Sequence, residues 1–297
     1  MRVLTIAKQM LRNYLRNRGV RQRLKKKEQW IAKGQIPWDD GYVIFKEDSI
    51  KAAIEDDMLK EGIKCKVLPQ KYGIRIDERI VEYPWIISNL KKERCKMLDA
   101  GSTFNFHYLL TSDTVALKNL TIFTLCPENQ FYNERGVSYH YGDLRDLPFK
   151  GEYFDEIICQ STLEHIDMDN SMYGSTPLTT TGLKPQKSFE YLKVIDELIR
   201  VLKCRGTLLI TFPFGRYENH GFFQQFDGDM LDKIKENMEI KGNLKIDFFQ
   251  YHSTGWQFAD QKACAKAESY NPHTRIGMKE DLAAHSRAVC CIKFIKA

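Results

Sequence analysis

The sequence lacks the long apolar runs and the cysteine spacing that mark several protein classes. Its apolar runs are only a few residues long, such as Leu208 to Ile210, whereas a membrane span needs about 20 apolar residues. No charged-then-apolar signal peptide opens the chain, and none of the eight cysteines forms a Cys-x-x-Cys pair. We therefore expect neither an integral membrane protein nor a Sec-exported one, and no zinc or other metal site. The scattered cysteines fit a reducing compartment, so a cytoplasmic protein is expected.

Acidic residues are nearly absent from the first 28 positions. This segment holds ten Lys and Arg residues against Glu28, so a local charge of +9 stands against a net charge of +6 for the whole chain. The remaining residues are therefore slightly acidic. With 43% hydrophobic residues in 297, they can bury a sizeable core, which argues against wholesale disorder.

Residues 1–28 form a basic amphipathic arm when drawn as a helix. Apolar residues line one broad side and cationic residues flank it, as listed here in chain order: Val3, Leu4, Ile6, Ala7, Met10, Leu11, Tyr14 and Leu15, with Lys8, Arg12 and Arg16 beside them. Such a helix can lie in the headgroup region of an anionic membrane. Three other interpretations stay open, namely packing on the body or a partner, a transit peptide, and contact with nucleic acid.

The remaining chain divides into an N-terminal extension, residues 29–94, and a larger region, residues 95–297. In the larger region, short apolar runs alternate with helical patterns, which is typical of a doubly wound α/β sheet. We predict a mostly parallel sheet of seven strands with an antiparallel edge strand. The predicted strands are 95–99, 120–126, 137–141, 155–160, 206–212, 244–251 and 288–295. A helix is predicted over 188–202, with Ser188 as its N-cap, and a lid-like loop over 167–187.

Polar and small residues follow several of the predicted strands. Asp99-Ala100-Gly101-Ser102 follows the first strand, Gly142-Asp143-Leu144 the third, and Gln160-Ser161-Thr162-Leu163-Glu164-His165 the fourth. Because doubly wound sheets bind ligands at the carboxyl ends of their strands, these side chains are expected to line one site.

Four segments in this order, "LDAGS", "GDLRDLPF", "FDEIICQSTLEHI" and "ELIRVLKCRGTLLITFPFG", resemble the class I S-adenosylmethionine-dependent methyltransferases, in particular the type 11 branch. The resemblance spans roughly residues 95–215. It implies that Asp99, Gly101 and Ser102 hold the amino-acid moiety of S-adenosylmethionine. It also implies that Asp143 accepts a hydrogen bond from the adenine amino group, beside the Leu144 amide.

The same resemblance places Gln160 and Ser161 beneath the sulfonium. Two features depart from the family pattern. The first motif of the family usually reads Gly-x-Gly-x-Gly, whereas here Gly101 is followed by Ser102, Thr103, Phe104 and Asn105. The second strand ends without the usual acidic residue. Glu128 could bind the ribose only if its loop folds back. A non-catalytic, methyltransferase-like binding module tethered by the basic arm therefore stays open as an alternative.

His165 and Glu164 are the candidate catalytic residues because they follow the fourth strand on the cofactor side. A histidine with near-neutral pKa can take the proton of an acceptor hydroxyl. Glu164 could orient it or share a divalent metal with a vicinal diol, although no metal is expected. Tyr83, Trp85, Tyr173 and Trp256 could stack on a sugar ring, although such residues more often pack in a core.

The expected acceptor is a hydroxyl or amine of a sugar, glycan or related small molecule. The "TLEHI…TFPFG" style resembles relatives associated with polysaccharide biosynthesis, and the arm suggests a peripheral position at the inner membrane face. DNA is not expected, because the fourth strand lacks the motif that grips an extruded base. RNA is a second alternative.

Overall fold

The fold is described from a computed structural model that places residues 18–174 and 187–297. Its centre is an eight-stranded sheet in the order β3-β2-β1-β4-β5-β10-β8-β9. The strand bounds are β1 Lys96–Ala100, β2 Asn119–Thr124, β3 Ser138–Tyr141, β4 Phe154–Gln160, β5 Leu202–Pro213, β8 Gly242–His252, β9 Gly255–Ala259 and β10 Ala288–Lys296. A separate pair joins β6 (Glu218–Asn219) to β7 (Gln224–Gln225).

Strands β1 to β5 pair in parallel, whereas β10 is antiparallel to both β5 and β8, and β9 is antiparallel to β8. The predicted doubly wound α/β sheet with an antiparallel edge strand is confirmed. The strand count is eight rather than seven, because the short edge strand β9 follows β8 after a tight turn at residues 253–254. The carboxyl ends of β1, β2, β3, β4 and β5 share one edge of the sheet.

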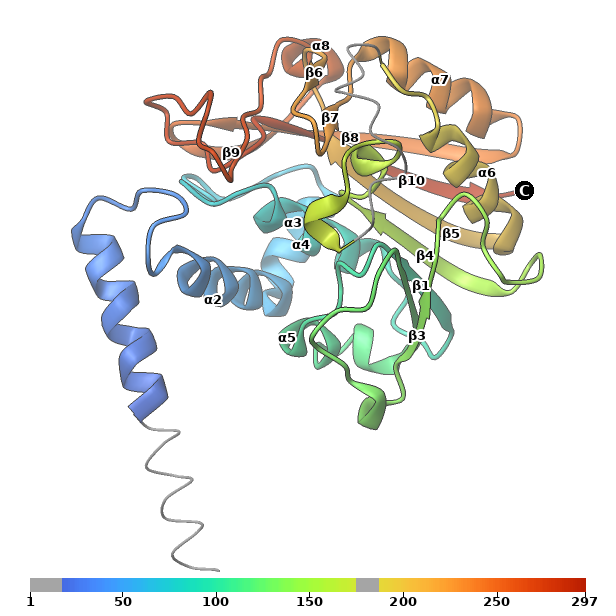
Figure 1. The fold of residues 1–297 in the computed structure, drawn as a ribbon, viewed down its shortest axis with the longest axis horizontal. Helices are drawn as coiled ribbons and strands as arrows, with labels where there is room; N and C mark the ends of the chain where they lie inside the picture. Colours follow the sequence, from blue (N-terminus) through green and yellow to red (C-terminus); the bar gives the residue numbers. More distant parts are fainter. Residues whose placement is uncertain (1–17, 175–186) are drawn as a thin grey trace, which may run out of the picture.

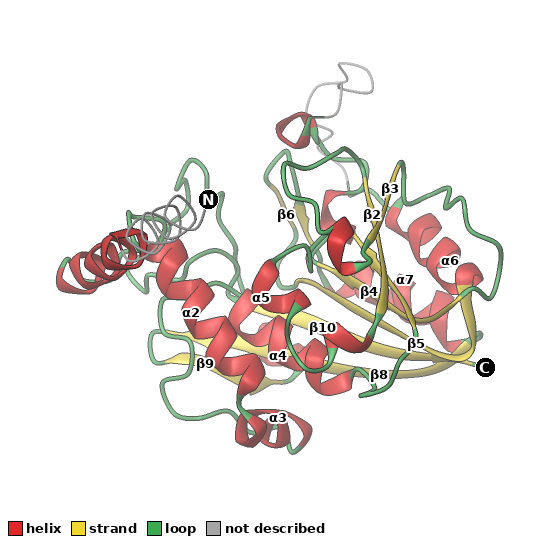
Figure 2. Cartoon of the chain, turned by 90° about the horizontal axis from the view of Figure 1, so that it is seen from below, coloured by secondary structure: helices red, strands yellow, loops and turns green. Residues whose placement is uncertain are grey.

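Helices cover both faces of the sheet (Figures 1 and 2). Their bounds are α2 Tyr42–Glu55, α3 Asp57–Lys64, α4 Arg79–Asn89, α5 His107–Leu110, α6 Tyr191–Val201, α7 Gly228–Glu239 and α8 Gln261–Cys264. Short 3-10 turns lie at Val115–Leu117, Asn133–Arg135, Leu163–His165 and Ser171–Tyr173. Helix α6 begins at Tyr191 with Glu190 as its N-cap, so the predicted cap at Ser188 is wrong. The Ser188 hydroxyl donates to Asp167 at 2.9 Å and accepts from the Glu190 amide at 3.4 Å.

The two faces of the sheet bury alternate residues of each strand, as the two-residue period of a strand requires. In β10, Cys290 packs into the core under α6 and α7, and its neighbour Cys291 packs into the core under α2, α3 and α4. The helices of the N-terminal extension therefore form the second helical layer of the sheet and reach its strand ends.

Residues 18–32 form a helix at the periphery of the molecule, beside α2 (Figure 1). Trp30 anchors its end, being 1% exposed against Tyr42. The apolar residues predicted for the first half of the arm lie in residues 1–17, outside the described part, and so do residues 175–186 of the predicted lid. No helix in the described ranges is long and apolar enough to cross a membrane.

Candidate functional site

The two predicted cofactor loops leave the sheet beside each other. The Gly101 amide donates a hydrogen bond of 2.9 Å to the Phe123 carbonyl, and the Gly142 amide donates one of 3.0 Å to the Thr124 carbonyl. Phe123 and Thr124 are the last two residues of β2, which separates β1 from β3. The loops that follow Asp99 and Asp143 therefore flank the same strand end.

Asp99 is fully buried and fixes the loop that follows β1. Its carboxylate accepts hydrogen bonds from the Thr103 amide (3.2 Å), the Thr103 hydroxyl (3.2 Å) and the Phe104 amide (2.8 Å). Burial raises the pKa of Asp99 to about 7, against the lowering effect of these bonds. The side chain thus shapes the loop, and its contact with a ligand stays a prediction.

Gly101 and Ser102 make this loop tight. Gly101 has φ of +121°, and a Cβ there would lie 2.1 Å from the Thr162 hydroxyl oxygen, so only glycine fits. Ser102 also adopts a positive φ, of 61°, a conformation that costs a serine more than a glycine. Its hydroxyl is buried without a hydrogen-bond partner among the described residues.

Asp143 is half-exposed at the end of β3 and binds its neighbour Arg145. The Asp143 carboxylate accepts from the Arg145 amide at 2.9 Å, from Nε at 3.0 Å and from Nη2 at 2.6 Å. Although partial burial opposes the change, Arg145 holds the pKa of Asp143 below its ordinary value. Arg145 also pairs with Glu190 at 3.1 Å. The Leu144 side chain is buried in the core cluster that includes residues of α6.

Glu128 lies where the loop after β2 folds back toward the loop after β1. Its Oε2 accepts a hydrogen bond of 2.8 Å from Asn105, which also bonds the Gln130 carbonyl at 3.1 Å. The Tyr139 hydroxyl on β3 donates a hydrogen bond of 2.9 Å to Asn105 Oδ1. The fold-back on which a ribose-binding role depends is therefore present, while the role itself stays a prediction.

Helix α4 contributes residues to the site that sequence analysis missed. The Glu82 carboxylate accepts hydrogen bonds from Ser161 (2.8 Å), Thr211 (2.6 Å) and Gln160 (3.2 Å), and it pairs with Arg79. Glu82 is 0% exposed, so the carboxyl ends of β4 and β5 are completed by a helix about 80 residues earlier in the chain. The only signal in the sequence is a carboxylate inside the otherwise apolar run of 80–87.

His165 lies in the 3-10 turn after β4, and a backbone carbonyl orients it. Its Nδ1 is 2.7 Å from the Phe222 carbonyl oxygen, and because a carbonyl can only accept, Nδ1 carries the proton and Nε2 keeps its lone pair. Burial lowers the pKa of His165 to about 4, well below the expected near-neutral value. The imidazole is therefore neutral at pH 7.

Glu164 is buried next to His165 and does not orient it, contrary to expectation. Its Oε2 has no hydrogen-bond partner in the described part of the chain. Burial raises the pKa of Glu164 well above its ordinary value, against the opposing charge of Arg79. Burial therefore disfavours the charged form of this carboxyl group. Among the described residues, no group of three or more His, Cys, Asp or Glu could hold a metal ion.

Of the four aromatic residues that could stack on a sugar, only Tyr173 is exposed, at 48%. Its ring lies 5.5 Å from the His165 ring at a T-shaped angle. Tyr83, Trp85 and Trp256 are each 3% exposed or less and pack in the core. Tyr173 therefore borders the histidine, while the other three are structural.

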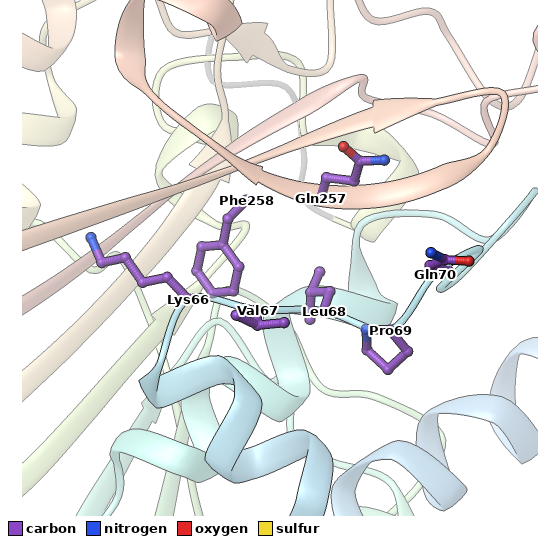
Figure 3. Close-up of a pocket in the computed structure, with 7 residues that line it drawn as sticks. All are labelled: Lys66, Val67, Leu68, Pro69, Gln70, Gln257 and Phe258. Carbon is purple, nitrogen blue, oxygen red and sulfur yellow. The ribbon is translucent and has the colours of Figure 1, made fainter.

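A separate pocket lies at the far edge of the sheet, between the loop after α3 and strand β9 (Figure 3). It is lined by Lys66, Val67, Leu68, Pro69, Gln70, Gln257 and Phe258. Three strands separate β9 from β4 in the sheet. This pocket is therefore distinct from the loops that follow β1, β3 and β4.

Comparison with known proteins identifies the region that carries these loops. Residues 98–210 match the family model described as a methyltransferase domain. This range runs from β1 to β5 and includes every residue predicted to bind the cofactor or to act in catalysis. No curated protein matches the chain in sequence.

Several solved structures are similar in fold. The YcgJ protein from Bacillus subtilis is 15% identical, with a TM-score of 0.41 over 70% of this chain and 94% of its own. The 1,6-didemethyltoxoflavin-N1-methyltransferase of Burkholderia thailandensis, solved with S-adenosylhomocysteine, is 13% identical, with a TM-score of 0.40 over 69% and 72%. NodS from Bradyrhizobium japonicum is 10% identical, with a TM-score of 0.34 over 68% and 77%. None of these similarities bears on the acceptor of this chain.

Proposed function

The chain carries a class I S-adenosylmethionine-dependent methyltransferase domain, and we propose that it methylates a hydroxyl or amine of a sugar, glycan or related small acceptor. The observation that carries this proposal is the neutral His165, whose Nε2 lone pair is available beside the exposed ring of Tyr173. A base that takes a hydroxyl proton and an aromatic ring that stacks on a sugar face suit such an acceptor.

The residues present fit the cofactor. Three buried polar atoms at the carboxyl ends of β1 and β4 have no partner among the described residues: Ser102 Oγ, Gln160 Oε1 and Glu164 Oε2. Native structures seldom leave such atoms unpaired, so they indicate a polar ligand. The missing side chain of Gly101 lets Thr162 pack against it, which brings the loops after β1 and β4 together. Asp143 and Leu144 would meet the adenine, and Glu128 the ribose.

When bound, S-adenosylmethionine supplies an electrophilic methyl group on a sulfonium. The residues around the site would have to hold the acceptor oxygen against this group and exclude water. His165 Nε2 takes the hydroxyl proton while its Nδ1–H stays on the Phe222 carbonyl. Glu164, whose pKa burial raises, would lie beside His165 where a second acceptor oxygen could bind its unpartnered Oε2.

The test is methyl transfer from labelled S-adenosylmethionine to a panel of nucleotide sugars and polysaccharide fragments, with RNA as a parallel substrate. With an active sugar acceptor, His165→Ala should lower turnover about 100-fold and leave the affinity for S-adenosylhomocysteine unchanged. His252→Ala, at an exposed position, is the matched control and should be silent. Methylation of RNA but no sugar, or full activity of His165→Ala, would contradict the proposal.

We further propose that the basic arm holds the enzyme on an anionic membrane surface. On the helix of residues 18–32, Val20, Leu24 and Ile31 are 52%, 50% and 44% exposed, and their spacing places them on one side. Another side binds the body, where Lys26 pairs with Asp40 at 3.0 Å, while Lys27 borders the stripe and pairs with Asp48 at 2.7 Å. An exposed apolar stripe in a cationic helix suits the headgroup region.

Flotation with liposomes containing phosphatidylserine tests this role. The full chain should float, and the variant Val20→Ser/Leu24→Ser/Ile31→Ser should float less, since it loses the apolar stripe but keeps every charge. Neutral phosphatidylcholine vesicles should bind less than anionic ones. Equal flotation of the variant would contradict the role of the stripe, and dimerisation without flotation would assign it to a second copy.

A further inference from the structure

Arg79 is the first residue of α4 and lies where this helix meets the ends of β4 and β5. Its Nη1 donates to Glu82 Oε2, the same oxygen that accepts from Gln160 Nε2 at 3.2 Å. The Arg79 side chain is 24% exposed, whereas that of Glu82 is 0% exposed. The Arg79 side chain is therefore partly exposed beside a fully buried carboxylate. No hydrogen bond to a described residue engages its Nε or Nη2.

The charge of Arg79 acts on the loop that follows β4. Burial is the main cause that lowers the pKa of His165, and the positive charge of Arg79 lowers it further. At Glu164, burial raises the pKa and the charge of Arg79 opposes this rise. Helix α4 also contacts the loop after β1, because the Tyr83 hydroxyl donates to the Thr103 carbonyl at 2.7 Å. The helix that carries Arg79 therefore contacts both the loop expected to hold the amino-acid moiety of the cofactor and the strand end expected beneath its sulfonium.

Two buried polar atoms, one in the loop after β1 and one at the end of β4, have no hydrogen-bond partner among the described residues. Gln160 is 0% exposed, and since its Nε2 is turned to Glu82, its Oε1 is left as a buried acceptor without a donor among the described residues. Ser102 Oγ is likewise unpartnered. A guanidinium with free donors, a carbonyl acceptor and a hydroxyl complement a group that carries both a carboxylate and an ammonium.

We propose that Arg79 binds the carboxylate of the methionine moiety of S-adenosylmethionine through Nε and Nη2, while Gln160 Oε1 accepts a hydrogen bond from its ammonium. Glu82 is a positioning residue: it holds Nη1 of Arg79 and turns the Gln160 amide so that Oε1 faces the ligand. The inference rests on the methyltransferase activity and not on the identity of the acceptor.

Titration calorimetry with two ligands tests the assignment. S-adenosylhomocysteine carries the amino-acid moiety, and 5′-methylthioadenosine keeps the adenosine and sulfur without it. Arg79→Gln should weaken S-adenosylhomocysteine binding about 10- to 100-fold, as expected for lost charged hydrogen bonds, and leave methylthioadenosine binding within about twofold. Arg79→Lys keeps a charge beside Glu82 without the planar pair of donors, so its loss should be intermediate.

Arg94→Gln, at an exposed position before β1, is the matched control and should change neither affinity. Equal losses for both ligands in the Arg79 variants would overturn the assignment in favour of a general effect on the fold, as would no loss for either. If Arg79→Gln does not fold, the Arg79→Lys comparison still decides between these outcomes. Failure of the unaltered protein to bind S-adenosylhomocysteine is a separate result, which would contradict the cofactor itself.

Discussion

The Ser161 hydroxyl, at the end of β4, donates a hydrogen bond of 2.8 Å to the Glu82 carboxylate on α4. Thr211 on β5 donates to the same oxygen at 2.6 Å, and Arg79 pairs with the other. A buried carboxylate is costly unless such partners surround it. This relationship makes the N-terminal extension part of the site rather than a separate appendage, because one helix ties together two strand ends and a cation.

We predict that Glu82→Gln destabilises the protein by about 3–5 kcal/mol, since it leaves Arg79 without its anionic partner and turns an amide toward the donors. Urea unfolding at pH 7 measures the change. Glu55→Gln, at an exposed position of α2, is the control and should stay within about 0.5 kcal/mol of the unaltered protein. A loss at Glu82 no larger than that of the control would mean that the buried network does not stabilise the fold.

The strand ends were predictable from the sequence, but their partner helix was not. Asp99, Asp143 and Gln160 each follow a short apolar run, so local pattern and the parallel sheet place them together. The approach of Glu82 to Ser161 depends on the packing of α4 over the sheet, which no local pattern encodes. Strand β9 was missed for a related reason, because five residues with a glycine at one end give little periodicity.

His165 shows a second limit of prediction from the sequence. Its position after β4 could be predicted, but its pKa depends on burial and on the Phe222 carbonyl, 57 residues later in the chain. The tertiary fold therefore determines the protonation state, while the sequence indicates only where the side chain stands.

Gly101→Ala should abolish cofactor binding and destabilise the protein. An added Cβ would lie 2.1 Å from Thr162 Oγ1 in a backbone conformation with φ of +121°, and such strain costs about 1–3 kcal/mol before any clash. Calorimetry with S-adenosylhomocysteine and thermal unfolding measure the two effects. Gly228→Ala is the control, because nothing lies within 4 Å of its added Cβ. Normal binding by Gly101→Ala would show that this loop does not approach the ligand.

His165 should stay neutral well below pH 6. With a pKa of about 4 against an ordinary value of 6.5, the unfolded chain binds this proton more readily than the folded protein does. Its contribution to stability is therefore complete above about pH 6.5 and falls as the pH drops toward 4. Nuclear magnetic resonance titration of the imidazoles, with His165→Gln to assign the signal, measures the pKa. A midpoint near 6.5 would contradict the buried, neutral state.

The last prediction concerns the opposite end of the strands, where Lys118 and Glu156 form an ion pair of 2.6 Å with both side chains 0% exposed. Lys118 also donates to the Lys91 carbonyl, and the Glu156 carboxylate accepts from the Lys91 amide and the Cys95 thiol. Lys118→Met should cost about 3–5 kcal/mol in urea unfolding, because it leaves a buried carboxylate without its cation.

The double variant Lys118→Met/Glu156→Leu should recover most of this loss, since a buried ion pair often stabilises no more than apolar residues of similar volume. Both variants should bind S-adenosylhomocysteine like the unaltered protein, because the pair lies at the amino ends of β2 and β4 and the site at their carboxyl ends. A double variant no more stable than Lys118→Met would show that the pair itself, and not the charge left behind, stabilises the fold. Weakened binding would show that the two ends of the sheet are coupled.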